Sequence, residues 1–387
     1  MDPVLHYLQH GAGEGRDPSP AFDTKWYVAK YPDVGRSNLN PLLHYVCFGK
    51  AEGRDPTPPR LSPATAVRSK AASPYRVTHI AGGRAVDPAA RSVLLCAHAA
   101  GDNLFGGERS FIDIARGLAE NCFNVHVTLP RLSWSYVDSL KPFASSIGVF
   151  RYESWRDGNA VNMLAVEEFR ILCRSHSVDA VHANTLVLRE PLIAARLEDI
   201  PGIAHIREIV DRDEPLAQSI GADAPMILRT VMDNASWLVC NSKASAAPFK
   251  DHQKVAILGN TIDIDAFDIP NHVTGGEVRI GIISSNLPKK GIEDFVELAA
   301  AASVEIPNAR FLIIGPSNPF VEALKAAGRL RGNIEFAGYA DTPLKAIGIA
   351  NSAGNFSHFA ESFGRTALEA MAARRPVIAY RWGALPE

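Results

Sequence analysis

Short runs of apolar residues alternate along most of this chain with longer segments in which apolar positions recur every three or four residues. The runs have the length of buried strands, and the spacing between them is that of helices with one buried face. Strands that alternate with helices predict an α/β protein with a parallel, doubly wound sheet, whose ligands lie at the carboxyl ends of the strands. The predicted strands lie at 92–98, 124–129, 178–184, 203–208, 277–285, 310–316, 333–339 and 377–380, with the end of another at 355–359.

The N-terminal segment follows a different pattern and contains a repeat. PVLHY at 3–7 returns as PLLHY at 41–45, and EGRDP at 14–18 returns at 52–56, in both cases 38 positions later. Each copy is typical of short helices, and one such unit cannot bury its apolar face alone. We expect the aromatic residues between the copies to serve packing; the alternative is sugar or partner binding. These residues are Trp26, Tyr27 and Tyr31.

A stretch rich in Pro, Ala, Ser and Arg separates the repeat from the α/β pattern and predicts an extended linker. The predicted organisation is a mainly helical repeat segment at 1–59, a linker at 60–90, a Rossmann-like domain at 91–260, an interdomain linker at 261–276 and a second Rossmann-like domain at 277–387.

Length and charge narrow the class of protein. A chain of 387 residues, 47% of them hydrophobic and with a net charge of −2, suits two or three globular domains and lacks the basic character of a nucleic-acid-binding protein. No run is long enough to span a membrane, and the N-terminus lacks the features of a signal peptide, so we expect a cytoplasmic protein. Five scattered cysteines without a C-x-x-C pair indicate reduced thiols, and we expect no zinc site.

The segment 355–387 carries the strongest candidate chemistry. The end of an apolar strand is followed by Ser362, which can cap a helix beginning at Phe363, and Gly364 would let a ligand approach the backbone. The free N–H groups at such a helix start stabilise a phosphate. Phosphate is therefore the predicted ligand at this point.

Two carboxylates flank that helix start. Glu361 precedes the helix and Glu369 lies about two turns inside it, so their Cα atoms are expected to be about 10–12 Å apart. Two carboxylates that act on one glycosidic bond need about 5–9.5 Å. The longer spacing suits two groups that hold opposite ends of an extended ligand, with a diphosphate between them.

These residues also carry a resemblance. ESFGRTALE at 361–369, followed by AMA, by PVI at 376–378 and by GALPE at 383–387, resembles the E-x7-E signature and trailing segment of the retaining family-4 glycosyltransferases. The resemblance implies the GT-B fold, in which two Rossmann-like domains face a cleft. It also implies that Glu361 contacts the transferred sugar, that Glu369 binds the nucleotide ribose, and that the diphosphate meets Gly364, Arg365 and Thr366.

Two further segments are similar to the same family. Gly106 and Gly107 stand between a predicted strand and a helix at 111–119, and such a pair predicts either a close approach of the backbone to a ligand or a tight turn. GGERS at 106–110 also resembles the family's loop beside donor and acceptor. Lys289 and Lys290 lie in a loop similar to the one that grips the donor diphosphate with an arginine and a lysine. Two ammonium groups can offset that charge without arginine's bidentate geometry; the alternative is a solvated pair.

One role is left open between two side chains. Members of the family often carry a histidine after the strand at 203–208, facing the transferred sugar; Arg207 falls in that register, and His205 precedes it by two positions. His182, in a segment similar to the family's D-V-V-H strand, is predicted to be a hydrogen-bonded structural histidine. Thr261 replaces the glycine of the family's interdomain N-G-I-D segment.

Metal binding is not predicted. D-x-D patterns occur at 211–213 and 263–265 and hold Mn²⁺ or Mg²⁺ in other transferases, but so short a pattern arises by chance. The resemblance implies that no metal and no cofactor are needed, since the nucleotide sugar is a substrate.

The sequence therefore predicts a retaining glycosyltransferase that moves a sugar from a nucleotide-sugar donor to a saccharide or lipid-linked saccharide acceptor. The repeat resembles repeats beside glycosyltransferase domains in bacterial surface-polysaccharide proteins, which implies a role in that biosynthesis, in the cytoplasm or peripherally on the inner face of its membrane. The resemblance covers about 92–387 and stops where relatives continue, so a truncated chain is expected. Two alternatives remain: a catalytically inactive adaptor, and a GT-B nucleotide-sugar epimerase, which would need no acceptor.

Overall fold

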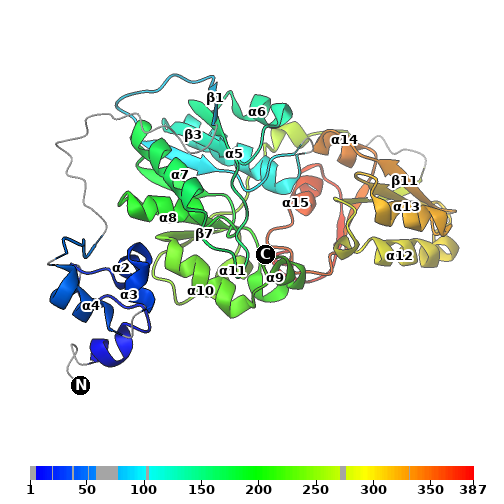
Figure 1. The fold of residues 1–387 in the computed structure, drawn as a ribbon. Coiled ribbons are helices and arrows are strands. Elements are labelled where there is room, and N and C mark those ends of the chain that lie inside the picture. Colours follow the sequence, from blue (N-terminus) through cyan, green and yellow to red (C-terminus); the bar gives the residue numbers. More distant parts are fainter. Residues whose placement is uncertain are drawn as a thin grey trace. The chain divides into compact units, whose positions relative to one another are not determined.

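The chain divides into two compact units, Met1–Ala72 and Ser73–Glu387, which are described separately. A computed structural model describes residues 6–19, 21–36, 39–50, 52–57, 77–101, 104–270, 276–330 and 332–387 (Figure 1). Most of the predicted linker at 60–90 lies outside these residues, as does the segment 271–275.

In the first unit, the described parts of the two copies of the repeat fold alike. Both HY motifs lead into short π-helices, η1 (Tyr7–Gly11) and η2 (Tyr45–Gly49), and the segment between them forms three short helices. Tyr27 is fully buried against Phe22 and Val34, with Trp26 and Tyr31 packed around them, which favours packing as the role of these aromatic residues. The three helices are α2 (Thr24–Lys30), α3 (Pro32–Arg36) and α4 (Pro41–His44).

The second unit begins with an eight-stranded sheet in the order β1-β4-β3-β2-β5-β6-β7-β8. All neighbouring strands are parallel except β1, which pairs antiparallel with β4 at the edge. Because β1 lies within the predicted linker, the prediction of a linker up to residue 90 was wrong for this part. The strands are β1 (Thr78–Ala81), β2 (Ser92–Cys96), β3 (Asn124–Leu129), β4 (Ser146–Val149), β5 (Ala180–Ala183), β6 (Gly202–Ile206), β7 (Trp237–Cys240) and β8 (Val255–Ile257).

Helices cover both faces of this sheet. Leu94 and Cys96 of β2 join one hydrophobic cluster, whereas the alternate residues Leu95 and Ala97 join the other, as expected where successive side chains point to opposite faces. The apolar runs are therefore continuous because both faces are buried. The helices are α5 (Gly106–Glu120), α6 (Trp134–Leu140), α7 (Met163–Ser175), α8 (Glu190–Leu197), η4 (Val210–Arg212), α9 (Glu214–Ile220), α10 (Ala224–Asn234), α11 (Lys243–Ala246) and η5 (Ala247–Phe249).

A second sheet of five parallel strands follows, in the order β11-β10-β9-β12-β13. The strand predicted at 377–380 was expected to be buried, but β13 is an edge strand and Ile378 is 45% exposed. The strands are β9 (Val278–Ile283), β10 (Ala309–Ile314), β11 (Ile334–Gly338), β12 (Ser352–Asn355) and β13 (Val377–Ala379). The helices are η6 (Asp265–Phe267), η7 (Pro288–Lys290), α12 (Ile292–Glu305), α13 (Pro319–Ala326), α14 (Pro343–Gly348) and α15 (Arg365–Ala372).

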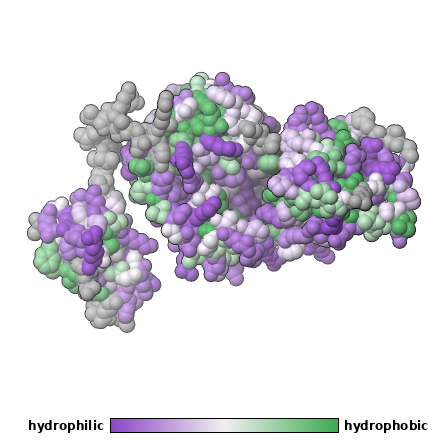
Figure 2. Space-filling model, turned by 45° about the vertical axis from the view of Figure 1, so that its right-hand side comes forward, coloured by the Kyte–Doolittle hydropathy of each residue, from purple (hydrophilic) through white to green (hydrophobic). Residues whose placement is uncertain are grey.

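The two parallel sheets confirm the predicted α/β class. Thr261, between them, is not among the described residues with a positive φ, so its side chain carries none of the strain that a left-handed turn would impose. No helix in the described residues is long and apolar enough to cross a membrane. The face in Figure 2 is largely hydrophilic, with apolar residues in small groups.

Candidate active site

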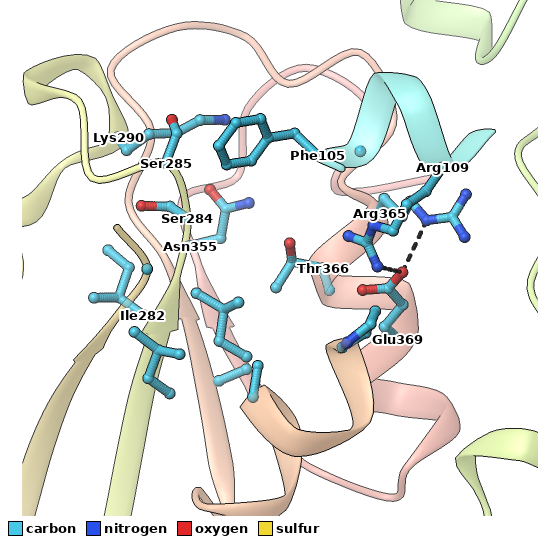
Figure 3. A pocket seen from close by; sticks show the side chains of 18 of the residues that line it. Phe105, Arg109, Ile282, Ser284, Ser285, Lys290, Asn355, Arg365, Thr366 and Glu369 are labelled. Atoms are coloured by element: carbon cyan, nitrogen blue, oxygen red, sulfur yellow. Dashed lines mark hydrogen bonds and ion pairs between the residues drawn. The ribbon is translucent and has the colours of Figure 1, made fainter. Parts of the chain in front are cut away.

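A cavity of about 590 Å³ lies where the carboxyl ends of the strands of both sheets meet. Residues that follow β2, β9, β10 and β12 contribute to its wall, together with the first turns of α5 and α15 (Figure 3). All but three of the predicted site residues line it. The predicted residues that line the cavity are Gly106, Gly107, Lys290, Glu361, Gly364, Arg365, Thr366 and Glu369.

The start of α15 differs in detail from the prediction. The helix begins at Arg365, not at Phe363, and its N-cap is Gly364, whose φ of 80° suits glycine. Ser362 does not cap the helix: its hydroxyl donates to the backbone carbonyl of Arg207 and accepts from the amide of Asn241. Gly364 therefore both turns the chain and leaves the first N–H groups of α15 uncapped by a side chain at the cavity wall.

Glu361 and Lys290 form an ion pair in the wall of the cavity. Lys290 Nζ lies 2.8 Å from Glu361 Oε1, and the Ser357 hydroxyl donates to the same oxygen over 2.7 Å. Burial raises the pKa of Glu361, but the charge and hydrogen bond of Lys290, helped by Ser357, outweigh it, so the pKa lies below its usual value. Glu361 is thus a half-buried, ionised carboxylate beside a cation.

Glu369 is only 2% exposed and is held by two arginines. Its Oε1 accepts from Arg109 Nη1 at 2.6 Å and from Arg365 Nε at 2.8 Å, and its other oxygen points towards the cavity (Figure 3). Arg109 comes from α5 and Arg365 from α15, so the carboxylate joins a helix of the first sheet to a helix of the second. One carboxylate oxygen is therefore left facing the cavity.

Arg365 makes a second link between these helices. Its Nη1 donates to Asp113 Oδ2 at 2.7 Å and to the Ser110 hydroxyl at 3.0 Å, both on α5. Figure 1 shows α15 beside α5. The guanidinium of Arg365 was predicted to contact the diphosphate. In this structure it is already hydrogen-bonded to three side chains, those of Glu369, Ser110 and Asp113.

Three predicted site residues lie outside the cavity wall. Lys289 stands 3.7 Å from Asp213 Oδ1, whereas its neighbour Lys290 faces the cavity. His205 is 1% exposed and shares a hydrogen bond of 3.2 Å with His182, with the rings stacked 5.3 Å apart. Arg207 donates from Nε and Nη1 to Asn184 and Asn260, and its Nη2 has no hydrogen-bond partner among the described residues. We therefore assign no catalytic role to His205 or Arg207 and no donor contact to Lys289.

His182 has the predicted structural environment. Burial, and then the charge of Arg207, lower the pKa of His182 to about 3 and that of His205 well below its usual value. Both imidazoles are therefore neutral at physiological pH, and they lie inside the first sheet.

The glycine pair is neither a loop nor a tight turn. Gly106 and Gly107 form the first turn of α5, and neither has a positive φ. A Cβ at Gly107 would lie 3.3 Å from Cε1 of His98, which also lines the cavity. The sequence interpretation missed His98, Arg109 and Asp113. Arg109 precedes the helix predicted at 111–119, so its place four residues before Asp113 on one helix face becomes visible only with the observed start of α5 at Gly106.

The arrangement suits a ligand with a phosphorylated centre and hydroxylated ends. Lys290 and the start of α15 offer positive charge, whereas Glu361 and Glu369 offer carboxylate oxygens, the usual acceptors for sugar hydroxyls. No group of three or more His, Cys, Asp and Glu side chains that could hold a metal occurs among the described residues. That no metal is needed stays a prediction.

Comparison with known proteins agrees with this geometry. Residues 277–387 match the family Glycosyl transferases group 1. Anabaena HepE in complex with UDP and glucose is similar in structure, with 19% identity, a TM-score of 0.60, and coverage of 76% of this chain and 82% of that chain. A glycosyltransferase from Rickettsia africae ESF-5 gives 18% identity and a TM-score of 0.57, with coverage of 76% and 80%.

A more distant similarity is to an S. aureus TarM mutant in complex with Fondaparinux, alpha-GlcNAc-glycerol and UDP, with 10% identity, a TM-score of 0.57, and coverage of 76% of this chain and 86% of that chain. No curated protein matches the sequence. The fold is the GT-B fold of these glycosyltransferases, with two Rossmann-like domains that both line the cavity. The match of residues 277–387 to Glycosyl transferases group 1 confirms the resemblance seen in the E-x7-E segment.

Proposed function

We propose that this protein transfers a sugar from a UDP-sugar to a hydroxyl of a saccharide or lipid-linked saccharide, with retention of anomeric configuration. The observation that carries the proposal is that Glu361 and Glu369 line one cavity, on either side of the helix start at Gly364. Complexes of the structural relative HepE contain UDP, or UDP-glucose, which supports a uridine nucleotide as the donor.

In the proposed complex the diphosphate lies against the first N–H groups of α15 and near Lys290. The free oxygen of Glu369 accepts a hydrogen bond from a ribose hydroxyl, and Glu361 faces the sugar. Lys290 is held by Glu361 before the donor binds, so the ammonium group is already placed where negative charge develops on the leaving phosphate. Stabilisation by a preplaced cation requires no metal, and we propose that none is used.

The proposed reaction breaks the bond between the anomeric carbon and the phosphate oxygen and forms one to the acceptor oxygen on the same face of the sugar. The leaving phosphate oxygen takes the acceptor's proton, so no separate base is required. We place this reaction in bacterial surface-polysaccharide biosynthesis, in the cytoplasm or at the inner face of its membrane, on the evidence of the N-terminal repeat and its resemblance to repeats in such proteins.

Calorimetric titration of the full chain with UDP, UDP-glucose and GDP-glucose tests the donor site. We expect the uridine nucleotides to bind, and Glu361→Gln to weaken UDP-glucose more than UDP, because only the sugar reaches Glu361. Transfer is then measured by release of UDP with and without saccharide acceptors, and the anomeric configuration of the product is read by NMR. If neither UDP nor UDP-glucose binds, the proposal is wrong.

A further inference from the structure

His98 is a cavity residue to which the proposed reaction assigns no role. It follows β2, lies against the first turn of α5, and belongs to the wall of the cavity on the side of the first sheet. The Cε1 edge of its ring faces Gly107 and would be 3.3 Å from a Cβ there, with Nε2 at 3.9 Å. Glycine at position 107 therefore leaves room for this edge of the imidazole beside the cavity.

A hydrogen-bonded chain fixes the other edge of the ring. Arg207 Nε lies 3.0 Å from Asn184 Oδ1, and Asn184 Nδ2 lies 3.3 Å from His98 Nδ1. A guanidinium can only donate, so it requires the carbonyl oxygen of the Asn184 side chain, and the amide nitrogen must face His98. Since an amide nitrogen also only donates, His98 Nδ1 has to accept, and the ring proton is placed on Nε2.

The chain is held rigidly at its far end. Asn184 is fully buried, and Arg207 also donates to the Asn184 backbone carbonyl at 3.0 Å and to Asn260 Oδ1 at 2.9 Å. Arg207 has no carboxylate within ion-pair distance among the described residues. The Nε and Nη1 groups of its guanidinium therefore orient neutral groups, whereas Nη2 has no hydrogen-bond partner among the described residues.

The ring stays neutral over the physiological range. Burial, and then the charge of Arg207, lower the pKa of His98 to about 4. A neutral imidazole with a fixed Nε2–H is a hydrogen-bond donor that neither attracts nor repels the diphosphate. This is the chemistry that recognises a sugar hydroxyl oxygen.

We propose that His98 is a substrate-binding residue that donates from Nε2–H to a hydroxyl of the transferred sugar or of the acceptor saccharide, with Asn184 and Arg207 as positioning residues. The proposal rests on the proposed function, because the cavity must take a sugar. The sequence suggested that His205 or Arg207 contacts the transferred sugar. In this proposal His98 makes a contact with a sugar hydroxyl, and Arg207 acts only indirectly, through Asn184.

The tautomer can be measured without any substrate. Two-dimensional ¹⁵N NMR of the imidazole nitrogens, with His98→Gln to assign the signal among the 12 histidines, should show Nε2–H for His98 and no titration between pH 6 and 8. Asn184→Leu should release the ring into a mixture of tautomers. The hydrogen-bonded chain from Arg207 through Asn184 to His98 is wrong if the wild-type signal comes from the Nδ1–H tautomer or from a protonated ring at pH 7. This result decides the question even if Asn184→Leu fails to fold.

The substrate contact is tested by two variants at position 98. Glutamine places an amide donor near the position of Nε2, so His98→Gln should keep kcat/KM within about threefold, whereas His98→Phe should lose about 10- to 100-fold, the range for one hydrogen bond to a substrate. Titrations with UDP and UDP-glucose locate the contact. Weaker binding of UDP-glucose but not UDP assigns it to the transferred sugar, and a raised KM for the acceptor alone assigns it to the acceptor.

The proposal fails if His98→Phe changes none of these quantities. It is distinguishable from failure of the proposed function, because a wild-type chain that binds no UDP-glucose refutes the donor site while the NMR spectrum still decides the tautomer. If the wild type binds UDP-glucose and transfers the sugar, and His98→Phe has the same kcat/KM and affinities, the proposed function stands and the proposed role of His98 is wrong.

Discussion

Replacement of Glu369 by alanine tests both the stability of the site and its ligand. The carboxylate is 2% exposed and neutralises two arginines whose side chains are 22% and 12% exposed. Glu369→Ala leaves Arg109 without this anionic partner, while Arg365 keeps Asp113 at 2.7 Å. The perturbation is therefore the loss of one buried charge that two cations share.

The loss of unfolding free energy in Glu369→Ala depends on which partners the two arginines keep. Breaking a buried ion pair by removing one partner costs about 3–5 kcal/mol of unfolding free energy. Because Arg365 keeps a carboxylate and Arg109 is partly solvated, we expect about 2–3 kcal/mol. An unfolding entropy of about 2.1 cal/mol/K per residue gives about 0.6 kcal/mol/K for the roughly 300 residues of the second unit, so Tm should fall by about 3–5 °C.

Differential scanning calorimetry measures the fall in Tm, and Glu322→Ala is a matched control. Glu322 also pairs with a basic residue on one helix, Lys325 at 2.8 Å, but its side chain is 58% exposed, so its loss should leave Tm almost unchanged. In the same samples, UDP affinity should fall at least about tenfold in Glu369→Ala and remain unchanged in Glu322→Ala. Equal Tm values for the two variants, with UDP affinity intact, would refute the reasoning.

Three further results are expected. Lys290→Ala should reduce transfer at least about 100-fold and Lys289→Ala less than about threefold, since only Lys290 lines the cavity, and equal effects would contradict this assignment. Gly364→Ala should lower Tm by several degrees, because φ is 80° and its Cβ would lie 2.4 Å from Leu385 Cδ2; an unchanged Tm would exclude this backbone geometry. The pKa of His182 is about 3 in the folded state and about 6.5 in the unfolded state, so the unfolded state gains the proton first as pH drops. The free energy of unfolding therefore falls below pH 6.5, by about 2 kcal/mol at pH 5. The fall in Tm from pH 7 to pH 5 should be smaller in His182→Gln than in the wild type, and an identical fall would contradict the lowered pKa.

The fold was largely predictable because its signals are local. Continuous apolar runs predicted strands buried on both faces, and β3 has the predicted bounds, 124–129. The approach of Glu361 and Glu369 to one cavity was also predictable, since both lie within one turn-and-helix segment. The start of α15 was wrong by two residues because Ser362 is used in a contact with Arg207, far away in sequence, instead of capping its own helix.

The rest of the site depends on tertiary contacts that no local pattern contains. Arg109 and Glu369 are separated by 260 positions, and their pairing follows only from the packing of α5 against α15. Lys289 and Lys290 are adjacent and chemically equivalent, yet in the short helix η7 they point in different directions, one towards Asp213 and one towards Glu361. The sequence could not rank them because direction, not composition, decides which one meets the ligand.

The proposed donor site is therefore not a property of the second Rossmann-like domain alone, although that domain carries the family match. Glu369 is 2% exposed, and one of its oxygens accepts hydrogen bonds from Arg109 of α5 as well as from Arg365. A ribose that binds the other oxygen meets a carboxylate whose orientation is set from both domains. If Glu369 binds the ribose as proposed, a movement of α5 relative to α15 changes the charge around its carboxylate, so nucleotide affinity and the relative position of the two domains are expected to be coupled through this one side chain.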